Sequence, residues 1–300
     1  MNKMTVFVGT LAALLAGSAG FAQNKVFTCD YLCQTPPGDE PRIFAPGVVS
    51  LTNKNTHALQ FSPDGQMLVI SRYPDRTSYY MVHTNGGWSA PRRTSFTGKE
   101  VSFDAAKRRL FYYDRGGDLC WVHYGDNGFS APTRLGTNIN TGETEYYPSI
   151  TGQGNLFFSR NGKWDQGRLM VARPEGEDFG APVDLGDLVN AGGASHGFVA
   201  PDESYLLFNS PRQGSYTKND VWACFRQSDG KWSAPVNLGP RINCDAMAVL
   251  CPTVSPDGKY LFFTRLQEGG PGLVYWVSTR VIEEARRSSG QSNPPREKTK

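Results

Sequence analysis

A phrase that recurs five times constrains this 300-residue chain more than any other feature. Each copy is a short apolar run preceded by a turn, and the clearest turns read Ser-Pro-Asp-Gly, at residues 62–65 and 255–258. Successive copies are 42 to 55 residues apart, a spacing typical of a supersecondary unit that stacks against its own neighbours. A leucine marks each run: Leu68, Leu110, Leu156, Leu206 and Leu261.

A second phrase, aromatic-small-Ala-Pro, follows each of the first four copies. Between the two phrases lies another apolar run, so each unit holds about four runs rich in aromatic and β-branched residues. Runs of this kind, bounded by Gly, Pro, Asn and Asp, are typical of strands. Five units of four strands predict a five-bladed β-propeller with four-stranded antiparallel blades. The second phrase stands at residues 88–91, 129–132, 179–182 and 232–235.

The fifth unit lacks its fourth strand, while a spare strand stands at the other end of the repeats, at residues 41–49. We expect this segment to complete the last blade, so that the ring closes without an exposed sheet edge. A β-sandwich and an open repeat are the alternatives. The regular repeat argues against the first, and the matched spare strand argues against the second. The predicted fold is therefore an all-β propeller over residues 41–279, forming one domain.

These phrases resemble the TolB-like family of propeller repeats, the Pro-Asp-Gly relatives of the WD repeats. The resemblance covers residues 41–277 and is best at 129–148 and 254–265. It implies a propeller fold, an exported or envelope location, and a role in binding other proteins. The second and third copies depart from the Pro-Asp-Gly turn, at residues 105–107 and 152–154, which leaves the geometry of those turns open.

The N-terminus has the pattern of a signal peptide over residues 1–22. Lys3 precedes an apolar run at 6–16, and small residues lead to a cleavage site after Ala22. The run is too short to span a bilayer, although an uncleaved anchor remains the alternative. We therefore expect a periplasmic or secreted protein without a membrane span in the mature chain. An N-terminal extension at 23–40 and, at 280–300, a short helix with a disordered tail flank the propeller.

The net charge of +3 depends on the ends of the chain. Lys3 and the basic tail from Arg286 account for it, and the body between them is slightly negative. A body of that charge argues against a nucleic-acid partner. We expect a monomer that binds a protein or an envelope component.

Six cysteines form an even number in an exported chain. Cys29 and Cys33, and likewise Cys244 and Cys251, are close enough in sequence to close small disulfide loops. Cys120 and Cys224 lie in apolar runs and are expected to be buried thiols. The four histidines are isolated and no paired ligand motif occurs, which predicts no metal site. The glycine fingerprints of nucleotide cofactors are also absent, so no cofactor is expected.

An arginine follows the same strand in every blade. Together these five side chains would form a cationic collar suited to carboxylates or phosphates. The alternative is a structural role within each blade, with Asp118 and Asp220 as partners, and the recurrence favours it. The residues are Arg72, Arg115, Arg160, Arg212 and Arg265.

The loops that lead into the first strand of each blade should gather at one mouth of the central channel. Their side chains differ from blade to blade, which is the pattern expected of a ligand site rather than of a repeated structural role. Solvated loop residues are the alternative interpretation. The candidates for ligand binding are His57, Glu100, Glu145, Tyr146, His196 and Asp245.

Two enzymatic hypotheses are weaker. Residues 193–197 match Gly-x-Ser-x-Gly around Ser195, but a strand follows where a nucleophile elbow needs a helix. Glu100, Glu145 and Asp245 could supply the carboxylates of a glycan hydrolase, although no spacing identifies a pair. We therefore predict a non-catalytic binding module, with a propeller-type glycan hydrolase or carbohydrate-binding protein as the alternative.

Overall fold

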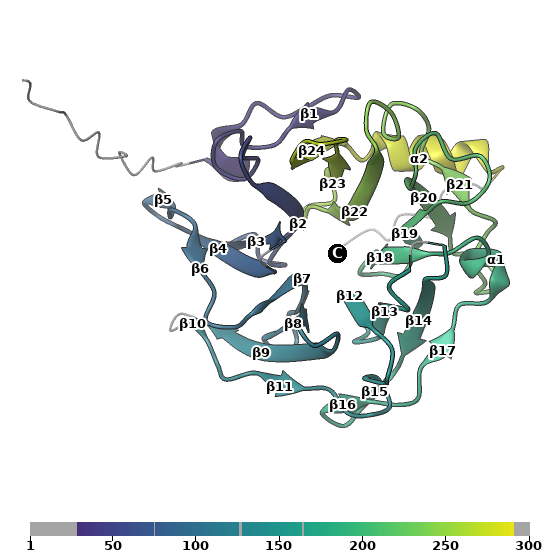
Figure 1. The fold of residues 1–300 in the computed structure, drawn as a ribbon, viewed down its shortest axis with the longest axis horizontal. Helices are drawn as coiled ribbons and strands as arrows, with labels where there is room; N and C mark the ends of the chain where they lie inside the picture. The colour runs from purple at the N-terminus through teal and green to yellow at the C-terminus, as the bar shows by residue number, and fades with distance from the viewer. Residues whose placement is uncertain (1–28, 75, 126–127, 164, 291–300) are drawn as a thin grey trace, which may run out of the picture.

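The computed structural model describes residues 29–74, 76–125, 128–163 and 165–290, and it forms a five-bladed β-propeller (Figure 1). The predicted signal peptide and the end of the tail lie outside the described residues. Five strands surround the axis, one from each blade, and in each blade further strands pair outward from the innermost one in antiparallel order. The innermost strands are β2 (Asn55–Phe61), β7 (Gly98–Asp104), β12 (Glu145–Ile150), β18 (Ser195–Val199) and β22 (Ala248–Val254).

The second and third strands of each blade continue the pairing outward. The second strands are β3 (Met67–Tyr73), β8 (Arg109–Asp114), β13 (Leu156–Arg160), β19 (Tyr205–Ser210) and β23 (Tyr260–Leu266). The third strands are β4 (Thr77–Thr84), β9 (Leu119–Gly125), β14 (Arg168–Ala172), β20 (Asp220–Phe225) and β24 (Gly272–Ser278).

The outermost position of each blade holds only short segments, and the aromatic-small-Ala-Pro phrase explains why. In three blades the phrase carries a serine whose Oγ accepts a hydrogen bond from a backbone N–H of the third strand: Ser89, Ser130 and Ser233. The phrase interrupts the outer strand, which resumes just after the proline. The outer segments are β5 (Gly87–Trp88), β6 (Arg92–Arg93), β10 (Gly128–Phe129), β11 (Thr133–Arg134), β17 (Val183–Asp184) and β21 (Val236–Asn237), with a hairpin of β15 (Pro174–Glu175) and β16 (Asp178–Phe179) in the third blade.

The predicted closure of the ring is confirmed. Strand β1 (Arg42–Ile43) pairs antiparallel with β24 and supplies the fourth strand of the last blade. Phe44 follows it and is completely buried against Phe262 and Trp276 of the last blade and Phe61 of the first. The two ends of the repeat are therefore joined by both backbone pairing and aromatic packing.

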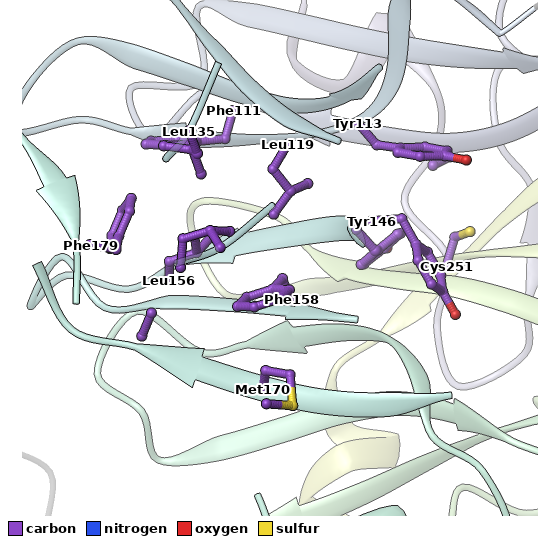
Figure 2. Packing of buried hydrophobic residues seen from close by; sticks show 14 of the residues in the cluster. Phe111, Tyr113, Leu119, Leu135, Tyr146, Leu156, Phe158, Met170, Phe179 and Cys251 are labelled. Carbon is purple, nitrogen blue, oxygen red and sulfur yellow. The ribbon is translucent and has the colours of Figure 1, made fainter. Parts of the chain in front are cut away.

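The hydrophobic core is divided into five clusters, and each lies mainly between two adjacent blades. Figure 2 shows the cluster between the second and third blades, which runs from Phe179 to Tyr146 and Cys251. Every blade therefore depends on both neighbours for burial of its apolar faces, which is the reason a propeller is a single cooperative unit.

Three short helical segments complete the described chain: η1 (Asp30–Cys33), α1 (Asp187–Asn190) and α2 (Arg280–Ser288). Helix α2 lies in the segment where the sequence predicts a short helix, and it buries Val281, Ile282 and Ala285 in the cluster between the last two blades. Arg286 does not belong to a loose tail, because it is buried over the ring of Phe225. Among the described residues, no helix has the length and apolar character needed to cross a membrane.

The cysteines follow the prediction in part. Cys29 and Cys33 form a disulfide, whereas Cys120 and Cys224 are buried thiols. The expected loop between Cys244 and Cys251 is wrong, because both cysteines are free. Cys251 lies in an innermost strand and points to the axis cluster described below, while Cys244 lies in the loop before that strand and bonds Arg265 and Asp245.

Candidate functional site

Each innermost strand contains a β-bulge near its beginning, and these five bulges build the site. The register shifts at His57 in β2, and it shifts at the equivalent step in the other four innermost strands. In those four the bulged residue has a positive φ, between 49° and 57°. Positive φ is uncommon for residues other than glycine, and such strain and bulges are concentrated at functional sites. The four residues are Glu100, Tyr147, His196 and Cys251.

A side chain from the preceding blade holds four of these bulges in place. It comes from the second strand of that blade and bonds the backbone of the bulged residue at 2.9 Å. Ring closure thus also fixes the backbone at the axis. The acceptors are Ser71 for Glu100 N–H, Ser159 for His196 N–H and Asn209 for Cys251 N–H, and Thr264 donates to the carbonyl of His57.

Glu100 is the centre of the cluster and its side chain is fully buried. Lys99 Nζ and His57 Nε2 both donate to its Oε1, the latter at 2.8 Å, and His196 Nε2 lies 3.9 Å from the same oxygen. Burial alone would raise the pKa of Glu100, but Lys99 and the His57 hydrogen bond hold that pKa well below its usual range. Glu100 is therefore an ionised carboxylate at neutral pH.

Aromatic rings surround the two histidines. The ring centroid of His196 lies 5.3 Å from that of Tyr146, 5.0 Å from that of Tyr147 and 5.7 Å from that of His57. Burial lowers the pKa of His196 to about 3 and also lowers the pKa of His57. Both imidazoles are therefore neutral at pH 7.

A thiol sulfur joins the carboxylate oxygens and imidazole nitrogens of the cluster. Cys251 is buried, and burial raises the pKa of its thiol well above the ordinary value. One ligand atom from each of His57, His196 and Cys251 lies within 4.8 Å of the other two. The sequence predicted no metal site because the histidines are isolated along the chain. The fold brings His57 and His196 together.

The structure brings together four of the six candidate mouth residues: His57, Glu100, Tyr146 and His196. It separates the other two. Glu145 is buried in an ion pair with Arg160, and Asp245 is exposed on its loop. Sequence reasoning missed Lys99, Tyr147 and Cys251. The sequence does contain a signal that locates the bulged residues: in every copy they stand nine to eleven positions before the marker leucine.

The repeated arginines have mainly a structural role, which we call the latch role: each of four holds a loop of its own blade in place. Four of them donate to a backbone carbonyl in the loop that precedes the first strand of their own blade, and each also stacks on an aromatic ring. Arg115 differs, because Asp114 stands at the equivalent position and Arg115 is exposed. The pairs are Arg72 with Val48, Arg160 with Ile139, Arg212 with Val189 and Arg265 with Ile242.

The acids expected to pair with these arginines have other roles. Asp118 forms an ion pair with Arg134, and Asp220 accepts hydrogen bonds from the backbone of Tyr216 and Thr217. Ser195 begins strand β18 and its Oγ lies 3.1 Å from Nδ1 of the next residue, His196. This geometry is part of a strand and not a nucleophile elbow.

We call the face on which the innermost strands begin the entry face. Strand β3 ends on this face at Tyr73, just before the loop to β4; Tyr73 is 45% exposed, and its ring lies 6.0 Å from that of His57 and 5.6 Å from Lys99 Nζ. Arg76 of the same loop donates to the carbonyl of Arg115 at 3.1 Å, which joins the first and second blades. An exposed aromatic and two arginines therefore lie above the buried cluster.

Comparisons with known proteins identify the fold and leave the family open. No protein-family model matches the chain, and no curated protein matches its sequence. Among solved structures it is similar to an endo-arabinase from Bacteroides thetaiotaomicron, with 13% identity, 80% of this chain and 96% of that chain covered, and a TM-score of 0.51. At this identity the likeness shows the propeller fold alone.

Two TolB proteins are also similar in structure. The TolB from Agrobacterium tumefaciens is 17% identical over 72% of each chain, with a TM-score of 0.49. The TolB from Acinetobacter baumannii is 13% identical, with a TM-score of 0.49, over 76% of this chain and 52% of that one. This chain thus matches about half the length of the Acinetobacter protein.

Proposed function

We propose that this protein is an exported, TolB-like propeller that binds a protein or another envelope component at its entry face. The observation that carries the proposal is the exposed Tyr73 beside Arg76 and Arg115, above the buried polar cluster. Tyrosine and arginine, together with tryptophan, are enriched among the residues that contribute most binding energy at protein interfaces. Tyr216, 60% exposed in the loop between β19 and β20, adds a second aromatic on the same face.

The state of the buried acids favours binding over glycoside hydrolysis. A glycosidase uses two opposed carboxyl groups, about 5–9.5 Å apart, and its general acid has a raised pKa. Glu100 has a lowered pKa and is bonded by Lys99 and His57. Glu145 is committed to Arg160 and to the hydroxyl of Thr141. Neither acid is poised to protonate a leaving group.

Affinity capture from an envelope extract of the source organism tests the proposal. The purified protein should retain one or a few partners in stoichiometric amounts, and the Tyr73→Ala and Tyr216→Ala variants should lose them. Truncating an aromatic anchor typically lowers affinity by about 10- to 100-fold, since an anchor is worth roughly 1–3 kcal/mol.

Lys259→Ala is the matched control, because this exposed side chain lies in the turn between β22 and β23, on the opposite face. It should leave capture unchanged. If the wild-type protein recovers no partner but hydrolyses members of a polysaccharide panel, the binding function is wrong and the hydrolase alternative replaces it.

A further inference from the structure

Three blades each contribute one metal-ligating side chain to the axis. His57, His196 and Cys251 stand on the bulges of β2, β18 and β22, and one ligand atom from each lies within 4.8 Å of the other two. Around a tetrahedral zinc ion, with metal–ligand distances of about 2.0–2.3 Å, ligand atoms lie about 3.3–3.8 Å apart. The separation thus exceeds the required one by no more than about 1.5 Å, which small side-chain rotations can close.

We propose that His57, His196 and Cys251 form a zinc-binding site on the propeller axis. Two imidazoles and a thiolate are ligands that zinc prefers, whereas magnesium and calcium prefer oxygen ligands. Three protein ligands leave the fourth tetrahedral position open, as in zinc sites that bind water or an exogenous ligand.

The hydrogen bonds of the two histidines match the outer shell of a metal site. His57 Nε2 bonds Glu100 Oε1 at 2.8 Å, which leaves Nδ1 to bind the metal. His196 Nδ1 bonds Ser195 Oγ at 3.1 Å, which leaves Nε2. Metal-ligating histidines generally use one nitrogen for the metal and the other for a carboxylate or another polar group that orients the ring.

Glu100 gives an independent indication of a missing group. Its Oε2 is buried and has no hydrogen-bond partner among the described residues. A buried carboxylate oxygen without a partner is costly, and a water held in the open position of a metal is the kind of donor that would satisfy it.

The charges near the site also accommodate a cation. Glu100 compensates Lys99, so the site without an ion is close to neutral, and the Cys251 thiol would lose its proton to bind the ion as a thiolate.

The experiment measures Zn²⁺ and Co²⁺ binding to the purified protein after chelation and under reducing conditions. We expect one Zn²⁺ per chain in competition with a chromophoric chelator. Co²⁺ should give a thiolate-to-cobalt charge-transfer band in the near ultraviolet, and Zn²⁺ should abolish that band. Zn²⁺ should also raise the melting temperature, because the ion binds the folded chain.

Variants of the proposed ligands test which side chains bind the metal. Cys251→Ser should remove the charge-transfer band and His196→Gln should strongly weaken binding. Glu100→Gln should lower affinity by roughly 10- to 100-fold, the usual effect of losing an outer-shell partner. The double variant Cys244→Ser/His123→Gln is the control, because Cys244 is a free cysteine outside the cluster and His123 is exposed on β9. It should bind as the wild type does.

Circular dichroism shows whether each variant is folded, and Cys251→Ala provides a second removal of the thiolate. A wild-type protein without the thiolate band, or a folded Cys251 variant that binds Zn²⁺ with unchanged affinity, would overturn the proposal. The measurement uses the isolated protein, so its outcome is distinguishable from that of partner capture, in which Tyr73 is changed.

Discussion

Arg160 and Glu145 show how a repeated residue contributes to stability. Arg160 Nε bonds Glu145 Oε1 at 2.9 Å, and the guanidinium also reaches the carbonyl of Ile139 at 2.9 Å. The carboxylate is fully buried. A buried ion pair contributes little by itself, but removing one member leaves an uncompensated charge in the interior.

We therefore expect Arg160→Ala to lower the free energy of unfolding by about 2–4 kcal/mol. Urea denaturation monitored by tryptophan fluorescence measures the change. Arg115→Ala is the control, because Arg115 is exposed and its equivalent position is occupied by Asp114, and it should change stability by no more than about 0.5 kcal/mol. Equal effects of the two variants would contradict the latch role.

The cysteines provide a second prediction at the residue scale. Non-reducing peptide mapping should find a bridge between Cys29 and Cys33 and none at Cys244 or Cys251. Cys244 is the one remaining cysteine with partial exposure, so alkylation of the native protein should label it first. A peptide that links Cys244 to Cys251 would require the start of β22 to be rebuilt.

At the scale of elements, one asparagine bonds a loop to a strand. Asn140 lies in the loop that connects the second blade to the third, and it bonds β9, the third strand of the second blade. Asn140 Oδ1 accepts from Leu119 N–H at 2.8 Å, and its Nδ2 donates to the carbonyls of Leu119 and Leu135 at 2.9 Å. Asn190 and Asn243 bond the third strands of their blades in the same way. This Gly-x-x-Ile/Val-Asn phrase is a strand-edge cap repeated in three blades.

Asn140→Ala should destabilise the protein by about 2–3 kcal/mol, because it leaves the buried backbone N–H of Leu119 without the Asn140 acceptor and removes both amide donor contacts. Asn138→Ala in the same loop is the matched control, since Asn138 is exposed, and it should be nearly neutral. Thermal unfolding of both variants measures the difference. A neutral Asn140→Ala would show that water replaces the cap.

At the scale of the whole molecule, stability depends on closing the ring. Phe44 is fully buried, and its ring centroid lies 5.0 Å from that of Phe262 and 5.2 Å from that of Trp276. We expect Phe44→Ala to cost about 3–5 kcal/mol, the usual cost of deleting a buried phenylalanine. Calorimetry checks this value, and Arg42→Ala on the exposed strand β1 is the control.

Deleting residues 41–49 removes both β1 and Phe44 and should abolish cooperative unfolding or lower the melting temperature strongly. The physical reason is that each blade depends on both neighbours for burial, so opening one interface exposes two apolar faces. An unchanged melting temperature would mean that the ring does not depend on this strand.

The sequence by itself determined the number of blades, the order of their strands and the closure by residues 41–49. Those features follow from local turn chemistry and from patterns that recur every 42 to 55 residues, and both can be read from one sequence. It also placed His57, Glu100, Tyr146 and His196 near the same mouth, because equivalent loops in a ring meet at one end.

Only the tertiary structure decided which of these side chains touch. His57, His196 and Cys251 are separated by 139 and 55 positions in the chain, so no local motif relates them. Their proximity arises from three β-bulges, each held by a side chain of the preceding blade. A bulge changes the direction of one side chain through a backbone geometry that depends on neighbouring strands. For that reason the axis cluster, and the zinc site proposed there, became visible only when the ring was closed.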